Sequence, residues 1–294
     1  PNKTAVRDAI LAHIQSLSQS GLYDGIFLDR MRFPSPAADL GRWLVCFCDD
    51  CQQAMVKDGL EHTLVRHEIG ETLSKADGAP LILQEIAGNQ IFSSSAFSNF
   101  MNFRTRNITQ FIDEVAALIR AEGLAVGLGC FAPSLTYMVG QDLAALSKLG
   151  DWIKVMTYAH TLGPAGLPFE LRELANWLMA HGAGERQALV SLSEIVQIRL
   201  PEDLAALSNP GLSTTALQSE VRRGKMAASI PVLAGIELVK LEGVTHLSPD
   251  QIRGDLTALQ EIQVDGLSLS WDLWHMPLPY LELVAKIFSK ENEG

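Results

Sequence analysis

The fold is decided by one stretch of sequence, Tyr23-Asp24-Gly25-Ile26-Phe27-Leu28-Asp29-Arg30-Met31-Arg32-Phe33-Pro34. Its short apolar run, 26–28, is typical of a buried strand in a parallel sheet. The run ends abruptly in Asp29, followed by Arg30 and Arg32. In barrel enzymes, charged residues at the C-terminal ends of strands carry the chemistry. An acid between two arginines is costly to desolvate, so we expect these three residues to serve a site, with an ion pair that closes the barrel end as the alternative.

Strands and helices alternate along the rest of the chain. Apolar runs predict strands at 26–28, 124–131, 152–158, 187–192, 230–238 and 266–271, while 79–86 fits a strand or a helix. Helical spacing predicts helices at 5–18, 53–74, 99–121, 142–149, 171–181, 214–228, 248–262 and 278–289. Thr4 and Ser248 are expected to cap the first and seventh of these helices, and Pro249 suits a first helical position.

This alternation predicts an α/β fold, a (β/α)8 TIM-barrel-like domain spanning residues 1–294 with a loop insertion at about 34–98. The predicted strands fall short of the eight of a full barrel. We therefore expect N-terminal strands to be rearranged, or to lie before Pro1. An open doubly wound sheet is the alternative, but no strand leads into the Gly-rich turn that such dinucleotide folds use.

Composition narrows the function classes. The 294 residues are 47% hydrophobic and 19% charged, with a net charge of −11. That charge argues against nucleic acid, whose binding rests on Lys and Arg, and it suits a neutral substrate such as a sugar. No apolar run reaches the length of a membrane span. The chain opens on Pro1 without Met or signal sequence, so we expect a segment to have been removed; localisation and oligomeric state stay open.

Three predicted strands end in a carboxylate: Asp29, Glu237 and Asp272. In a barrel all three would lie at one rim. Cleavage of a glycosidic bond needs two carboxyl groups, one as acid and one as nucleophile or base. Capping of helices and pairing with the neighbouring arginines are the alternative roles for any one of them.

Aromatic residues accompany these strand ends, namely Tyr137, Tyr158, Trp271 and Trp274. Flat rings bind the C–H faces of sugars at low entropic cost, so we expect these residues to line a cleft, with core packing as the alternative.

Three further polar residues are candidates for substrate contact. Lys154 lies within an apolar strand, where lysine is rarely buried unpaired, and Asp29 is one expected partner. His160 follows Tyr158 at the same rim. Asp142 either contacts substrate from a rim loop or caps the helix that follows; the cap is favoured.

Several motifs in order resemble bacterial glycoside hydrolases with a TIM-barrel catalytic domain. They are YDGIFLDRMRFPSP, CFCDDC, the Phe103-Arg104 pair, GLAVGLGCFAPSL, VGQDLAALSKLGDWIKVMTYAHTLGPAG and LSWDLW, which together cover about residues 20 to 280. The resemblance implies that the strand before Asp29 is the fourth of the barrel, and that Glu237 and Asp272 end the seventh and eighth.

The resemblance also implies a catalytic pair. Many barrel glycosidases place the acid/base after strand four and the nucleophile after strand seven, which match Asp29 and Glu237. The usual Asn-Glu pair after strand four is replaced here by Asp29, so either carboxylate could take either role. Asp272 would orient the pair or raise a pKa.

Cys46, Cys48 and Cys51 crowd one loop. They could hold a structural zinc ion, whose fourth ligand would be Cys130, His62 or His67; a local disulfide or free thiols are the alternatives. No other cofactor is expected. The leading hypothesis is a glycosidase that acts on an oligosaccharide or polysaccharide, and the alternative is a non-catalytic carbohydrate-binding barrel. A metal-dependent barrel hydrolase or lyase is less favoured, because no strand ends in a His-x-His pattern.

Overall fold

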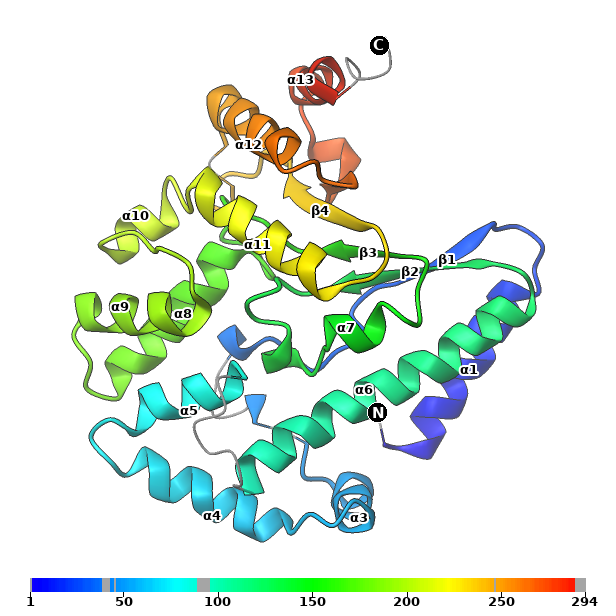
Figure 1. Ribbon diagram of the computed structural model, residues 1–294, viewed down its shortest axis with the longest axis vertical. Coiled ribbons are helices and arrows are strands. Elements are labelled where there is room, and N and C mark those ends of the chain that lie inside the picture. The colour runs from blue at the N-terminus through cyan, green and yellow to red at the C-terminus, as the bar shows by residue number, and fades with distance from the viewer. Residues whose placement is uncertain (1, 39–42, 45, 89–95, 246, 289–294) are drawn as a thin grey trace.

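A computed structural model describes residues 2–38, 43–44, 46–88, 96–245 and 247–288. Its centre is a parallel sheet of five strands in the order β1-β2-β3-β4-β5 (Figure 1). The strands are β1 Gly25–Leu28, β2 Ala125–Cys130, β3 Trp152–Val155, β4 Val232–Glu237 and β5 Gly266–Ser270. Sequential order with helical crossovers is the arrangement of contiguous strands in a (β/α)8 barrel, so the structure is a partial TIM barrel.

Helices connect the strands and cover the outer face of the sheet. The helices are α1 Thr4–Ser18, α3 Asp49–Lys57, α4 His62–Leu73, α5 Gly78–Ile86, α6 Ala96–Ala121, α7 Leu143–Leu146, α8 Leu167–Ala180, α9 Glu185–Val196, α10 Leu204–Ser208, α11 Thr214–Ala227, α12 Pro249–Glu261 and α13 Leu278–Phe288. Short 3-10 turns are η1 Pro36–Ala38, η2 Tyr137–Val139 and η3 Leu273–His275. No described helix has both the length and the apolarity that a membrane span requires.

The core between sheet and helices follows from the two side-chain periods. Alternate strand residues such as Leu28, Val126 and Leu128 point outward and are buried. They meet Ile112 and Val115 on the buried stripe of α6, which lies beside α1 (Figure 1). A second cluster joins α3–α6 and α8–α13 to the sheet. The intervening strand residues, among them Phe27, Trp152 and Lys154, face the other, concave side of the sheet.

One predicted strand, 187–192, is a helix and belongs to α9. The segment 79–86, which fits a strand or a helix by sequence, is helical and lies in α5. The prediction at 187–192 was wrong because the short window hid the period: Ala188, Leu189, Leu192 and Ile195 are the buried residues, a spacing typical of a helix. Without these segments, the strands before Asp29, Glu237 and Asp272 are the first, fourth and fifth of the described sheet.

The predicted helices are present with shifted ends, and their caps differ from one to the next. Ser248 caps α12 in a full capping box with Gln251, and Pro249 is the first helical residue, as predicted. Thr4 was expected to cap α1, but Lys3 holds that position without a side-chain bond, and Thr4 is the first helical residue. The predicted helix at 53–74 is two helices, α3 and α4, because Gly59 has a φ of +77° and breaks it. The single-domain prediction, with its insertion at about 34–98, stays a prediction; that segment contains η1 and α3–α5.

Candidate functional site

Glycines on two strands make room for two charged side chains on the concave face. Gly129 of β2 pairs with Lys154 of β3 in the register of the sheet. A Cβ on Gly129 would lie 2.9 Å from Oδ1 of Asp29, and one on Gly235 would lie 3.1 Å from Cε of Lys154. Side chains at positions 129 and 235 would therefore displace the two charged groups. Asp29, Gly129 and Lys154 thus lie side by side across β1 to β3, and Gly235 of β4 lies beside the end of the Lys154 side chain.

Two residues earlier on each of these strands, Phe27, Gly127 and Trp152 lie side by side and form an apolar layer. The rings of Phe27 on β1 and Trp152 on β3 stack with centroids 5.1 Å apart and an interplanar angle of 3°. They meet over Gly127 of β2, where a Cβ would come within 2.3 Å of the indole. This layer forms a firm base beneath the level of Asp29 and Lys154.

The charged level opens into a pocket of about 770 Å3. That volume suits a ligand of one to a few sugar rings. The residues that line it are Asp29, Arg30, Arg32, Phe33, Pro34, Lys154, Met156, Tyr158, Pro164, Ala165 and Trp271. Asp29, Arg30, Arg32, Lys154, Tyr158 and Trp271, all predicted from sequence to serve one site, thus come together in one pocket.

The loop after β1 brings two arginines into the pocket. Arg30 has a φ of +56°, a strained conformation for a residue with a side chain, and its N–H donates to Oδ1 of Asp29 at 2.9 Å. Arg32 lies over the ring of Phe131 at 4.6 Å, and its Nη1 donates to the carbonyl of Phe33. Burial lowers the pKa of Arg32, while the charges of Glu170 and Asp29 act in the opposite direction.

Two aromatic side chains form the opposite wall. Tyr158 is buried and donates its hydroxyl proton to Oγ of Ser270 at 2.7 Å. Trp271, 45% exposed, meets Tyr158 edge to face with centroids 6.4 Å apart. A half-exposed indole beside a fixed phenol is a surface on which a sugar ring can stack.

Glu237 ends β4 beside this wall, since its cross-strand partner in β5 is Ser270. Its side chain is 4% exposed and does not line the pocket. Oε1 accepts a hydrogen bond from the backbone N–H of His160. Burial raises the pKa of Glu237 to about 7, and the charge of His160 opposes that rise. Glu237 can therefore hold a proton near neutral pH.

His160, predicted to contact substrate, is directed away from the pocket toward α12. Its Nε2 lies 2.8 Å from Oδ2 of Asp255, and its Nδ1 lies 2.7 Å from the carbonyl of Pro210. Burial alone would lower the pKa of His160. The hydrogen bond to Asp255, with the charges of Asp255 and Glu237, outweighs burial and raises that pKa to about 9. The imidazolium thus links the β4 end of the rim to α12.

Besides Glu237, His160 and Tyr137, three further predicted site residues lie outside the pocket lining. Asp142 caps α7, accepting from the N–H groups of Ala144 and Ala145, which is the favoured alternative. Asp272 caps η3 and bonds to Nδ1 of His275, and that hydrogen bond lowers the pKa of Asp272. Trp274 is 94% exposed. The catalytic and binding roles predicted for these residues stay predictions.

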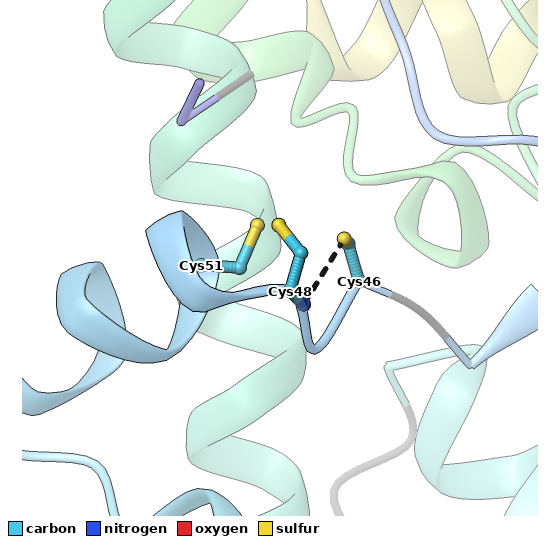
Figure 2. A group of neighbouring side chains, drawn as sticks. All are labelled: Cys46, Cys48 and Cys51. Carbon is cyan, nitrogen blue, oxygen red and sulfur yellow. Dashed lines mark hydrogen bonds between the residues drawn. The ribbon is translucent and has the colours of Figure 1, made fainter. Parts of the chain in front are cut away.

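The cysteine loop forms a compact cluster of its own. The Sγ atoms of Cys46, Cys48 and Cys51 all lie within 4.8 Å of one another, and Figure 2 shows the side chains projecting to one side of the loop and of the start of α3. The three thiols are free, and the group could bind a metal. A hydrogen bond from the backbone of Cys51 lowers the pKa of Cys48, whereas burial raises the pKa of Cys51 to about 12.

None of the predicted fourth ligands joins this group. Among the described residues the cluster holds only the three cysteines, without Cys130, His62 or His67. Cys130 is buried in β2, and His67 pairs with Glu71 on the surface of α4. A separate cavity of about 430 Å3 connects the cluster with Arg30 and Arg32. The cysteine loop thus adjoins the loop that lines the main pocket.

Sequence reasoning missed the residues that support the site. Asp255 shares the buried face of α12 with Ile252, Leu256 and Leu259. An acid at that helical spacing among apolar residues indicates a buried partner, and this was the signal in the sequence. Gly129 and Gly235 could have been noticed as glycines inside apolar strands, which mark a close approach. Glu170, buried near Arg32 and bonded to Ser35, gave no sequence signal.

No family model and no curated protein matches the chain. Among solved structures, the chain is similar to a chitinase from Chromobacterium violaceum ATCC 12472, with 11% identity, a TM-score of 0.40, and 63% of this chain and 62% of that chain covered. It is also similar to the PgaB (BpsB) glycoside hydrolase domain from Bordetella bronchiseptica, with 10% identity, a TM-score of 0.41, and 96% and 60% covered.

A third similar structure is the spore cortex-lytic enzyme SleL from Bacillus megaterium QM B1551, with 11% identity, a TM-score of 0.31, and 72% and 53% covered. The chain spans 53% to 62% of the length of these three proteins. At such low identity, the chemistry of the site itself has to decide the function.

Proposed function

We propose that the protein is a glycoside hydrolase whose substrate lies on Tyr158 and Trp271. The observation that carries the proposal is the pairing of two unlike carboxyl groups at one rim. Asp29 is exposed in the pocket, whereas Glu237 is buried beside its wall with a pKa raised to about 7. Glycosidic cleavage requires one carboxyl group that holds a proton and a second that acts as nucleophile or base.

The environments suggest the roles. Glu237 is the proposed general acid, because burial keeps its proton on near neutral pH. Asp29 is the proposed nucleophile or base, since it faces the pocket and its Oδ1 accepts an N–H from Arg30. This order is the reverse of the one that the sequence resemblance implies. Asp272 has no part in the proposed pair.

The test is hydrolysis of a panel of aryl glycosides and polysaccharides by the wild type and by Asp29→Ala and Glu237→Gln. Each substitution should lower the rate of hydrolysis by about 1000-fold, which corresponds to an increase of about 4 kcal/mol in the activation free energy. Activity of the wild type should also decline above about pH 7, where Glu237 loses its proton. Asp113→Ala, at an exposed carboxylate of α6 outside the pocket, serves as the matched control. Full activity in both site variants would exclude the proposed pair.

A non-catalytic saccharide-binding barrel is the second candidate. It is favoured by the fact that Arg32 lines the pocket whereas Glu237 does not. This candidate predicts saccharide binding by the wild type that Asp29→Ala leaves intact, without any hydrolysis.

We propose further that the three cysteines hold a zinc ion with a structural role. In a tetrahedral zinc site, Zn–S bonds of about 2.3 Å put the sulfurs about 3.8 Å apart, and the three Sγ atoms here all lie within 4.8 Å of one another. Elemental analysis of the pure protein should find one zinc per chain, and none in a Cys46→Ser, Cys51→Ser variant. Cys130→Ser, in the buried strand β2, is the control. Absence of stoichiometric metal in the wild type would end this proposal.

A further inference from the structure

The pocket has a charge opposite to that of the protein as a whole. The chain carries a net charge of −11. The pocket lining contains three cationic side chains, Arg30, Arg32 and Lys154, and one carboxylate, Asp29. Cations gathered in one concave pocket focus a positive potential there, which attracts anionic groups of a ligand. This local charge differs from what the overall composition suggested.

Lys154 is the most informative of these cations. Its side chain is 8% exposed, within a strand of the sheet. Nζ lies 5.2 Å from the ring centroid of Tyr158, and in the described part of the chain no ion pair or hydrogen bond engages it. Nζ itself is not fully buried and meets the pocket, so a lysine within a strand of the sheet that lacks a counter-ion among the described residues points to a partner that arrives with the ligand.

The absence of a side chain at Gly235 leaves room for the side chain of Lys154. Gly235 leaves the concave face open where Cε of Lys154 passes, and Gly129 does the same for Asp29. Met156, two residues along from Lys154, lines the same pocket. The ammonium is therefore directed at the ligand volume by the shape of the sheet.

Arg32 supplies a second incompletely satisfied cation. Its Nη1 donates to Phe33, but its Nε is buried and has no hydrogen-bond partner among the described residues. Glu170 contributes negative charge nearby, yet its own oxygens accept from the hydroxyl of Ser35 and the N–H of Ala165. A planar guanidinium with a free donor edge fits a carboxylate.

We infer that the pocket binds a saccharide that carries a carboxylate in the form of a uronic acid residue, with Lys154 and Arg32 on the carboxylate. This inference rests on the proposed function, whose substrate class it names. The sugar ring stacks on Trp271, and the acid group lies toward β3 and the loop after β1. Arg30 adds positive charge at the pocket mouth.

The test measures binding by titration calorimetry. The ligands are oligomers of galacturonate, glucuronate and mannuronate, each beside its methyl ester, which keeps ring and linkage but removes the charge. At least one acidic oligomer should bind about tenfold or more tightly than its ester. Its affinity should fall as salt is raised. Equal binding of acid and ester throughout, or no binding by any acidic oligomer, would overturn the inference.

Variants of Lys154 test whether its ammonium contacts the carboxylate of the ligand. Lys154→Met removes the charge at similar size and should erase the preference for acid over ester, while Lys154→Arg should retain it. Lys148→Met, at an exposed position after α7, is the matched control and should bind like the wild type. Circular dichroism confirms that each variant is folded. An unchanged preference in Lys154→Met overturns the assignment, as does tighter binding of a sulfated oligomer than of any carboxylated one.

The binding assay separates this inference from the proposed function. Hydrolysis of neutral glycosides without any preference for acidic ligands supports the hydrolase and rejects the carboxylate. Selective binding of an acidic oligomer that is never cleaved supports the carboxylate and rejects the hydrolase.

Discussion

Asp29 and Glu237 occupy equivalent places in the sheet and have opposite environments. Asp29 follows β1 and is exposed in the pocket. Glu237 ends β4, is 4% exposed, and is bonded to the backbone of His160, whose ring is tied to Asp255. The comparison teaches that position at a strand end does not decide the state of a carboxyl group. The segments around the strand end decide it: His160, after β3, bonds to Glu237 and to Asp255 of α12, and among the described residues no such pair of buried acid and imidazole bonds to Asp29.

The largest expected effect comes from removing the charge behind Glu237. Asp255→Asn should lower the free energy of unfolding by about 3 to 5 kcal/mol, because His160 would lose its buried counter-ion. It should also return the pKa of His160 toward its ordinary value of 6.5, from the present value of about 9. Urea unfolding and NMR titration of the imidazole measure the two effects.

The matched control for that variant is Asp250→Asn, at an exposed position in the first turn of the same helix. It should cost no more than a few tenths of a kcal/mol. A similar small loss in Asp255→Asn would break the comparison, since the β4 end would then be no more enclosed than the β1 end.

The next effect is a pH dependence of stability. The pKa of Glu237 is raised from 4.5 to about 7, and that of His160 from 6.5 to about 9. In both cases the folded state binds the proton more tightly, so the stabilisation is complete at low pH and is lost as pH rises through the folded pKa. The free energy of unfolding should therefore fall between about pH 5 and pH 9.

Glu237→Gln isolates the contribution of the carboxyl group. The difference in stability between wild type and variant should change from pH 4.5 to pH 7, the window between the two pKa values of Glu237, and stay level above it. A difference in stability that stays constant from pH 4.5 to pH 7 would contradict the raised pKa of Glu237.

The smallest effect concerns the aromatic wall. Trp271→Ala should weaken saccharide binding by about fivefold, or about 1 kcal/mol, because the ring lines the pocket. Trp274→Ala, three residues on and 94% exposed, should leave affinity unchanged. Tryptophan fluorescence during ligand titration measures both. Equal losses would show that the ligand extends over η3, beyond the pocket.

Much of the fold could be predicted from local sequence. The runs at 26–28 and 124–131, the long helical stripe of α6, and the Ser248-Pro249 start of α12 carry strong local signals, and the structure has all of them. The failure at 187–192 has a local cause as well: six residues are too few to distinguish period 2 from period 3.6.

For the site, too, local sequence predicted one part and tertiary contacts decided the rest. The sequence by itself placed Asp29, Arg30, Arg32, Tyr158 and Trp271 at strand ends and Lys154 within a strand, and parallel strands bring such residues to one rim. Only the tertiary structure decided which of them face the pocket. It directed His160 to Asp255 of α12, 95 residues away in the chain, and enclosed Glu237 behind the wall. Burial and charge arise from contacts between distant segments, and no local pattern encodes them.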